Sequence, residues 1–328
     1  MKRRILFYLI LRKDLTNKSF FVILMLGEDM NKELIERYMP LVLEIKDKYN
    51  YDDNVCHLLY VIIPAFVYKY KYKENIIINV FKNTKIVISK EENKYVKAFY
   101  TSIPSYVGND IVTNKFIIIN NYKNISLVNL IDSLIHEFNH AVNSYNNEIS
   151  IKDNTLYLRT GLTYVSYEIP SLKALEKLPT YMLEEIINTK QTESIIDIIK
   201  NYKDTSNQFI SNIVYSLNNE TNNQYRSNAY YLETQILDKL LNNKTFMSTL
   251  ENLRITGNIS DIKDWFDNIS GIKDSYDSMI KKLNLIMDLE VKLAKAKYFK
   301  KGIIAKIRSL SKDIYYIIDN FNDNCNYR

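Results

Sequence analysis

Two histidines and a glutamate in the middle of the chain have the types and spacing of a metal-dependent hydrolase. His136, Glu137 and His140 lie in the run SLVNLIDSLIHEFNHAVN, residues 126–143. On a helix, residues four apart project from the same face, so the two imidazoles can reach one metal ion. Two histidines at this spacing are typical Zn²⁺ ligands, and a glutamate beside the first can act as general base toward a water molecule. We therefore expect one Zn²⁺ per chain at this site.

The helix that must carry these residues has a regular apolar pattern. Its apolar positions recur every three or four residues, at Leu127, Leu130, Ile131, Leu134, Ile135, Phe138, Ala141 and Val142. This spacing places them on one face, which should pack against a core and turn both imidazoles toward a different, polar space. The alternative is that both histidines are ordinary residues on the polar face of a helix. Because the chain has only 3 histidines, two of them at this spacing would seldom arise by chance.

The third ligand should be a carboxylate. No histidine follows His140, and neither Cys56 nor Cys325 lies in a metal-binding motif. The next long helix carries Glu184 and Glu185 on the two flanks of its polar side, and helical phase alone does not choose between them. The carboxylates that rank lower are Glu193 in the same helix, Glu168 and Glu176 before it, and Asp132, which is better placed as a partner of His136.

This arrangement resembles a known family. A helical HExxH followed by a glutamate on a later helix resembles the gluzincin metallopeptidases, the thermolysin-like branch of the zincins, and HEFNHAV resembles the HEFGHAV stretch of anthrax-lethal-factor-like peptidases. The resemblance implies a zincin-like fold, hydrolysis of a peptide or protein substrate with Glu137 as general base, and Glu185 as the ligand, with Glu184 in the place of Asn in LNEG-type segments. Asn139 and Thr189 depart from the family pattern, which often has Gly and an acidic residue there.

An oxyanion-stabilising group completes the chemistry of a peptidase. Tyr181 is the first candidate because it lies one turn before Glu185. The other tyrosines considered for this role are Tyr164, Tyr167, Tyr225 and Tyr230, although a packed aromatic is the usual role of any one tyrosine in a chain with 27 of them. Arg159 is a further candidate, as a contact for a substrate carbonyl or carboxylate.

The rest of the chain indicates an α+β fold with no linker. It has 328 residues, 46% of them hydrophobic, with 6 glycines and 5 prolines. We expect helices near 31–49, 52–70, 179–200, 206–217, 223–241, 259–266, 272–298 and 303–321, and strands near 76–81, 85–89, 95–102, 115–120 and in a hairpin at 155–167. The predicted units are a zincin-like catalytic portion at 30–200, with a small mixed sheet and the HExxH helix, and a mainly helical portion at 201–328 packed on it.

The two ends of the chain bear on partners and location. Residues 1–29 form an uncertain N-terminal extension that begins like a signal peptide but is interrupted by Arg12-Lys13-Asp14, so a cytoplasmic protein is expected. The net charge is +6, and its densest basic run is 292–312. Contact of these basic C-terminal helices with an anionic membrane surface is one interpretation, and a solvated helix face is the more usual one. No nucleic acid partner is expected.

Overall fold

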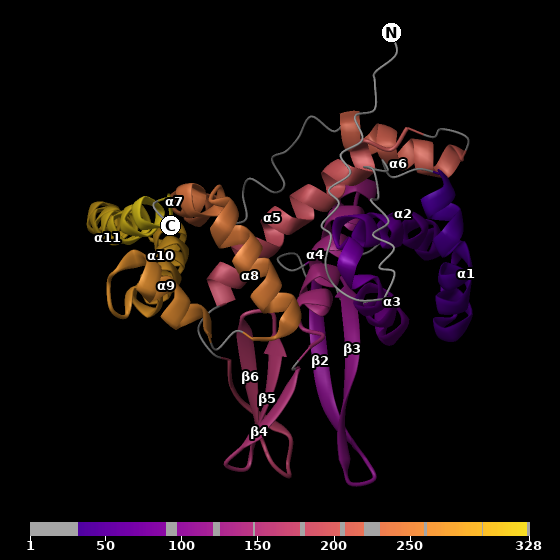
Figure 1. Ribbon diagram of the computed structural model, residues 1–328, viewed down its shortest axis with the longest axis horizontal. Helices are drawn as coiled ribbons and strands as arrows, with labels where there is room; N and C mark the ends of the chain where they lie inside the picture. Colours follow the sequence, from indigo (N-terminus) through magenta and orange to yellow (C-terminus); the bar gives the residue numbers. More distant parts are fainter. Residues whose placement is uncertain are drawn as a thin grey trace, which may run out of the picture.

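The computed structural model describes residues 32–89, 97–120, 125–146, 148–177, 181–203, 207–219, 230–258, 261–296 and 298–326. The predicted extension at 1–29 lies outside these residues. In the described part the chain is a mixed α+β structure with a helical C-terminal part, as expected. Two small sheets extend from the same side of a helical body (Figure 1). None of the described helices combines the length and apolarity that crossing a bilayer requires.

The first group of helices comprises α1 (Lys32–Tyr49), α2 (Asp53–Lys69), the short 3-10 helix η1 (Lys71–Lys73) and α3 (Glu74–Asn83). Asp52 caps α2 by accepting a hydrogen bond from the backbone N–H of Val55. The prediction of a strand at 76–81 was wrong, because these residues belong to α3. Ile77, Val80 and Phe81 are buried at helical spacing, so packing on neighbouring helices overrides the strand propensity of the isoleucines.

The first sheet has three strands in the order β1-β3-β2. The strands are β1 (Thr84–Ile88), β2 (Ala98–Val107) and β3 (Asp110–Ile119). β1 is parallel to β3, and β2 and β3 form a long antiparallel hairpin. Residues 103–107, which include Pro104 and follow the strand expected near 95–102, therefore continue that strand. Proline is tolerated there because β2 is an edge strand among the described strands, and Gly108 turns the hairpin at φ +63°.

The second sheet is a four-stranded antiparallel meander, β4-β5-β6-β7. Its strands are β4 (Ile149–Lys152), β5 (Thr155–Thr160), β6 (Thr163–Glu168) and β7 (Lys173–Lys177). The predicted hairpin at 155–167 corresponds to β5 and β6, whereas β4 and β7 were not predicted. In the sequence, α4 (Leu127–Asn143), the helix that carries the HExxH motif, lies between the two sheets, and it contacts β2, β3 and β5.

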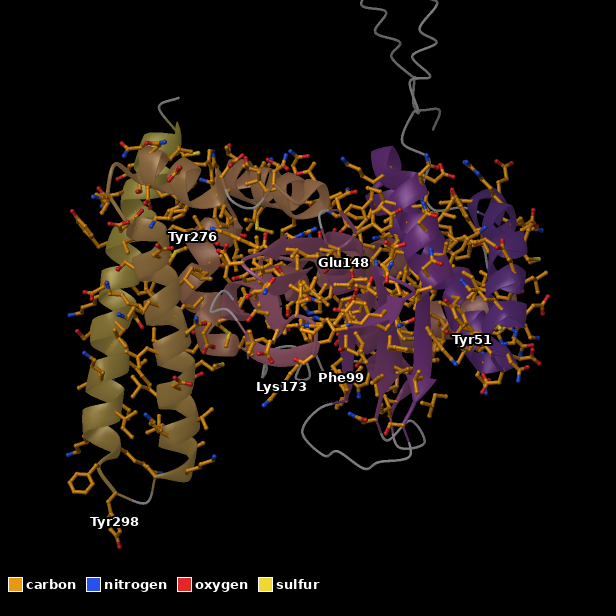
Figure 2. The ribbon with its side chains drawn as sticks, turned by 90° about the horizontal axis from the view of Figure 1, so that it is seen from below. Tyr51, Phe99, Glu148, Lys173, Tyr276 and Tyr298 are labelled. Atoms are coloured by element: carbon orange, nitrogen blue, oxygen red, sulfur yellow. The ribbon has the colours of Figure 1, made fainter. Side chains whose placement is uncertain are left out.

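The remaining helices are α5 (Tyr181–Lys200), α6 (Gln208–Asn219), α7 (Tyr231–Leu241), α8 (Lys244–Thr256), α9 (Ile262–Ser270), α10 (Ser275–Lys295) and α11 (Lys300–Asn326). The helical character of the chain after residue 178 was predicted, but no segment was assigned to α8. Helices α10 and α11 form a long hairpin at the far side from α1 (Figures 1 and 2).

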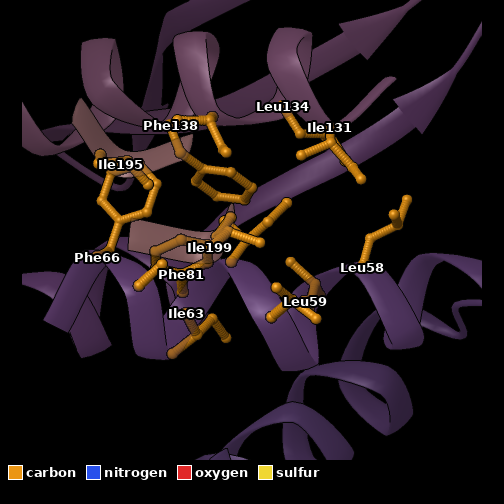
Figure 3. Packing of buried hydrophobic residues seen from close by; sticks show 14 of the residues in the cluster. Leu58, Leu59, Ile63, Phe66, Phe81, Ile131, Leu134, Phe138, Ile195 and Ile199 are labelled. Atoms are coloured by element: carbon orange, nitrogen blue, oxygen red, sulfur yellow. The ribbon is translucent and has the colours of Figure 1, made fainter. Parts of the chain in front are cut away.

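Two clusters of buried apolar side chains hold these elements together. In the first, Phe138 of α4 stacks on Phe81 of α3 with ring centroids 4.0 Å apart, and Ile195 and Ile199 of α5 close the same core (Figure 3). The second cluster joins the N-terminal half of α5, through Leu183 and its neighbours, to α7–α11. One helix thus belongs to both cores and fixes one relative to the other.

This division of the core differs from the predicted division of the chain at residue 200. α5 contributes to both clusters, and α6, assigned to the C-terminal portion by sequence, packs in the first cluster through Ile210, Ile213 and Leu217. The chain therefore passes from the first core to the second, back to the first through α6 and again to the second, although Ile255 of α8 packs in the first core.

Candidate metal centre

The motif helix α4 forms where the pattern predicts it. Ser126 caps it by accepting from the backbone N–H of Asn129 at 3.3 Å. Its apolar residues face α2 and α3, as Ile131, Leu134 and Phe138 show in Figure 3. The expected polar face is present. Its residues up to His136 are partly exposed, whereas His140 and Asn143 near its C-terminal end are buried where α5 packs against α4.

A seam of polar side chains joins α4 to α5. Asn139 donates to Thr192 Oγ1 at 3.2 Å, Asn143 donates to Gln191 Oε1 at 3.1 Å, and Asn188 donates to the carbonyl of His136 at 2.6 Å. Buried amides that find partners only in one arrangement hold two helices in a single register and rotation. This register decides which α5 residues meet the histidines.

The structure brings His136, His140 and Glu185 together. Glu185 Oε2 lies 3.1 Å from His136 Nε2 and 3.6 Å from His140 Nε2, and the three ligand atoms all lie within 4.8 Å of one another. Donors bound to a tetrahedral ion at about 2.0–2.2 Å are about 3.3–3.5 Å apart. The three side chains therefore fit a single metal ion with little rearrangement, and two imidazoles with one carboxylate suit Zn²⁺.

Glu184, the other candidate ligand, has a different position. It is 1% exposed, and its Oε1 lies 3.2 Å from His140 Nδ1, on the far side of that imidazole from Glu185. A carboxylate that accepts from Nδ1–H holds the ring in the tautomer whose Nε2 carries a lone pair for a metal ion. The geometry thus distinguishes the two glutamates that helical phase left open. Glu185 is the candidate ligand, and Glu184 is placed to orient His140.

The close approach of Glu184 depends on a glycine. Glu184 Oε2 accepts from the backbone N–H of Leu162 at 2.8 Å, in the turn between β5 and β6. Gly161 in this turn has φ +58°, and a Cβ there would lie 2.0 Å from Glu184 Oε1. A side chain at 161 would therefore displace the carboxylate as well as strain the turn.

Arg254 of α8 completes the surroundings of Glu184. Its guanidinium is fully buried and donates to Glu184 Oε1, to Gln191 Oε1 at 2.7 Å and to Asn188 Oδ1 at 3.3 Å. It thereby reaches three positions on one face of α5. No prediction named Arg254. The sequence does contain an indication of its position. Arg254 follows Leu250 by four residues and Phe246 by eight, so on a helix it shares their buried face.

Charge in the centre is balanced within the protein. Burial lowers the pKa of His140, but the carboxylates of Glu185 and Glu184 outweigh this and raise the pKa to about 10. Burial raises the pKa of Glu184, but Arg254 and His140 outweigh it and lower the pKa to about 2. The pKa of Glu185 is also lowered, because His140 and His136 outweigh its burial. Both carboxylates therefore stay ionised, and a metal ion would bind by displacing protons from the histidines.

Glu137 lies beside the three candidate ligands and is 8% exposed. Its Oε2 accepts from the backbone N–H of Tyr100 in β2 at 2.7 Å. Burial raises the pKa of Glu137 against the opposing effect of His136 and His140. A carboxylate with a raised pKa is a stronger base, which suits proton transfer near neutral pH. Tyr100, which positions Glu137 through its backbone, was not foreseen from the sequence.

A cavity of about 170 Å³ adjoins this group. It lies between β2, through Tyr100 and Ser102, and the β5–β6 hairpin, through Thr160, Val165 and Tyr167, with His140 and Glu185 in its wall. Of the tyrosines considered for oxyanion stabilisation, Tyr167 lines this cavity. The side chain of Tyr181, and all of Tyr225, lie outside the described part of the structure.

The suggested substrate contact of Arg159 was wrong. Its side chain is completely buried, and its guanidinium donates to the carbonyls of Asn143, Gly161 and Arg254 at 2.6, 2.7 and 3.0 Å, and to that of Asn146. Arg159 therefore joins the end of α4 to the β5–β6 turn and to α8.

Among the lower-ranked carboxylates, Glu193 pairs with Lys190 and Glu168 with Ser171. Among the described residues, neither these two nor Asp132 joins the ligand group.

Comparison with protein-family models, with curated proteins and with solved structures finds no match to this chain.

The two neighbouring glutamates should respond differently to substitution. We expect Glu185→Ala to lose the metal ion, because it removes one of three protein ligands, and Glu184→Gln to weaken metal binding about 10–100-fold, because it leaves the ligands in place but loosens His140. Elemental analysis and competition with a chromophoric chelator measure both effects. Glu193→Ala, on the same helix, is the matched control. Full metal content in Glu185→Ala together with its loss in Glu184→Gln would reverse the assignment.

Proposed function

We propose that this chain is a zinc-dependent peptidase of the glutamate-ligand kind, which hydrolyses a peptide or protein substrate. The observation that carries the proposal is the convergence of His136 Nε2, His140 Nε2 and Glu185 Oε2 beside the Glu137 carboxylate, next to a cavity that His140 and Glu185 line. Such a constellation binds a metal ion and places a base next to it, which is the requirement for hydrolysis of an amide.

Each residue has a distinct task in this proposal. Zinc bound by His136, His140 and Glu185 would supply Lewis acidity toward a scissile carbonyl and toward water. Glu137 would take the proton of the attacking water and give it to the leaving amine. Its buried position, with Tyr100 N–H on one oxygen, holds the carboxylate in place and leaves the other oxygen for the proton.

The edge of the first sheet gives the substrate a place to bind. The backbone N–H of Tyr100 points to Glu137 and not to β3. In an antiparallel strand, the backbone groups of residues two apart point the same way. Those of Tyr100 and Ser102 are therefore directed toward the cavity that both residues line. An extended peptide can add to such an edge by strand pairing. This would lay a peptide bond across the candidate metal centre, which favours a peptide over a compact small molecule.

The proposal is tested with the wild-type chain. The protein is stripped of metal, reloaded with Zn²⁺ and incubated with a peptide library, and cleavage is followed by mass spectrometry. About one zinc per chain by elemental analysis, cleavage only after reloading, and its loss with a chelator are the expected results. A reloaded protein that cleaves nothing in the library would contradict the peptidase assignment and favour a zinc-binding protein that acts by interaction. Failure to take up metal would contradict both.

Thr189 bears on this non-catalytic alternative, because it departs from the family pattern. It stands where an acidic residue often follows the ligand, and in the structure its hydroxyl donates to the carbonyl of Glu185 within α5, at 2.9 Å. Glu184 already supplies the carboxylate that orients His140. Glu184, one residue before the proposed ligand Glu185, therefore supplies the carboxylate that an acidic residue at position 189 would supply. Thr189 does not count against catalysis.

A further inference from the structure

The hairpin of α10 and α11 extends beyond the body of the molecule. Its proximal part is anchored, since Tyr276, Met279 and Leu283 of α10 and Ile318 and Phe321 of α11 belong to the second core. The last fully buried residue of α10 is Ile286, and α11 has none before Ile307. Figure 2 shows the connection between the helices, marked by Tyr298, at the end farthest from the core. The distal turns pack mainly on each other.

The tip of the hairpin exposes large apolar side chains. Phe299 is 91% exposed and Tyr298 78%, and Val291 and Ile304 on the two adjoining helix ends are 48% and 36% exposed. Phe299 also has φ +61°, a conformation in which a bulky residue is uncommon and glycine or asparagine is the usual choice. The turn therefore places an aromatic ring in solvent at a position that its backbone does not favour.

Basic residues surround these apolar side chains. The segment 291–312 contains Lys292, Lys295, Lys297, Lys300, Lys301, Lys306, Arg308 and Lys312 and no Asp or Glu. Its charge of +8 exceeds the +6 of the whole chain, so the rest of the chain carries −2. Of the described side chains on this segment, Lys292, Lys295, Lys300 and Lys301 are all exposed. The positive charge of this protein is thus concentrated at one projecting end.

Exposed aromatic rings with lysines close to them in the sequence are complementary to the surface of an anionic membrane. Aromatic side chains are favoured at the boundary between headgroups and acyl chains, and clustered lysines are attracted to anionic headgroups. A nucleic acid strand would need a groove to follow its backbone, whereas the end of a two-helix hairpin is convex. We propose that the tip of the α10–α11 hairpin docks on anionic lipid bilayers, with Tyr298 and Phe299 entering the headgroup boundary and Lys300 and Lys301 contacting lipid phosphates.

The test is cosedimentation of the full chain with two kinds of vesicle, phosphatidylcholine alone and phosphatidylcholine mixed with phosphatidylserine. We expect binding to the mixed vesicles that weakens as salt is raised, and little binding to the neutral ones. The double substitution Lys300→Gln with Lys301→Gln should weaken vesicle binding about 30-fold, because each lysine contributes a factor of about five. Phe299→Ala should weaken it about ten-fold, because the ring no longer enters the boundary.

Matched controls keep the outcome specific to the tip. Tyr316→Ala removes a 65%-exposed aromatic of α11 away from the tip, and Lys244→Gln with Lys281→Gln removes two exposed lysines elsewhere. Neither should change vesicle binding. Circular dichroism melts should be the same for all variants, because these side chains are exposed.

Three results would overturn the proposal. The first is equal binding to both vesicles, or binding that the tip variants do not weaken. The second is salt-sensitive binding to an oligonucleotide, lost in the lysine variant, with no vesicle binding. The third is self-association that disappears in Phe299→Ala while vesicles remain unbound, which would assign the tip to a second copy of this chain. All three are independent of the proposed peptidase activity.

Discussion

The Glu137→Gln protein is expected to bind metal like the wild type and to cleave peptides about 10²–10⁴ times more slowly. Glutamine is nearly isosteric with glutamate and can still accept from Tyr100 N–H, so the 2.7 Å contact with β2 need not change. It cannot take a proton from the attacking water. Glu137 is not among the three residues whose ligand atoms converge, so the metal ion should remain.

Two measurements check this prediction. Elemental analysis should give the same zinc content for Glu137→Gln and wild type, and initial rates on a peptide cleaved by the wild type should show the loss in kcat. Glu193→Gln serves as the control, because this glutamate lies on α5 and pairs with Lys190 outside the centre. Wild-type rates in Glu137→Gln would reject Glu137 as the base, and loss of zinc would give it a ligand role instead.

The second large effect is expected on stability. Replacing Arg254 with methionine should lower the free energy of unfolding by about 3–5 kcal/mol, because the Glu184 carboxylate would remain buried at 1% exposure without the guanidinium that, together with His140, balances its charge. Metal binding should weaken by about 10–100-fold as well, because Glu184 would no longer be held against His140 Nδ1. Urea unfolding at equilibrium and chelator competition measure the two quantities.

A double substitution separates this charge pairing from simple loss of packing. Glu184→Gln removes the uncompensated charge but can still accept from Leu162 N–H, so it should restore much of the stability lost in Arg254→Met. Arg159→Met is the matched control. Arg159 is equally buried but donates to carbonyls only, so Glu184→Gln should not rescue it. Equal rescue of both arginine variants, or a change below about 0.5 kcal/mol in Arg254→Met, would contradict the pairing.

The C-terminal part thus contributes to the centre as well as packing against it. Arg254 comes from α8, and its partner Glu184 is 70 residues earlier in the chain. Asn146, which follows α4, donates to the carbonyl of Ile255 at 2.7 Å. A fragment that ended at residue 200 would keep every candidate ligand and lose the cation that neutralises Glu184. The structural unit that surrounds the candidate metal centre therefore extends beyond residue 200.

Local pattern was sufficient where a single helix carries the information. The apolar stripe of α4 and the spacing of His136 and His140 share the helical period, so both follow from the sequence of one segment. The same reasoning failed at α3, where Ile76–Ile78 favour a strand but packing of Ile77, Val80 and Phe81 makes a helix. It also did not assign α8, where Phe246, Leu250 and Arg254 are buried at helical spacing.

The sequence by itself predicted the motif helix, a carboxylate as third ligand, and Glu184 and Glu185 as its first candidates by residue type and phase. Only the tertiary structure distinguishes the positions of these two glutamates. Consecutive helix residues point about 100° apart, so the rotation of α5 against α4 sets which glutamate meets both Nε2 atoms. That rotation is held by Asn139, Asn143 and Asn188 across the seam, and by Arg254 from a helix far along the chain. Such long-range contacts leave no periodic signal in a sequence.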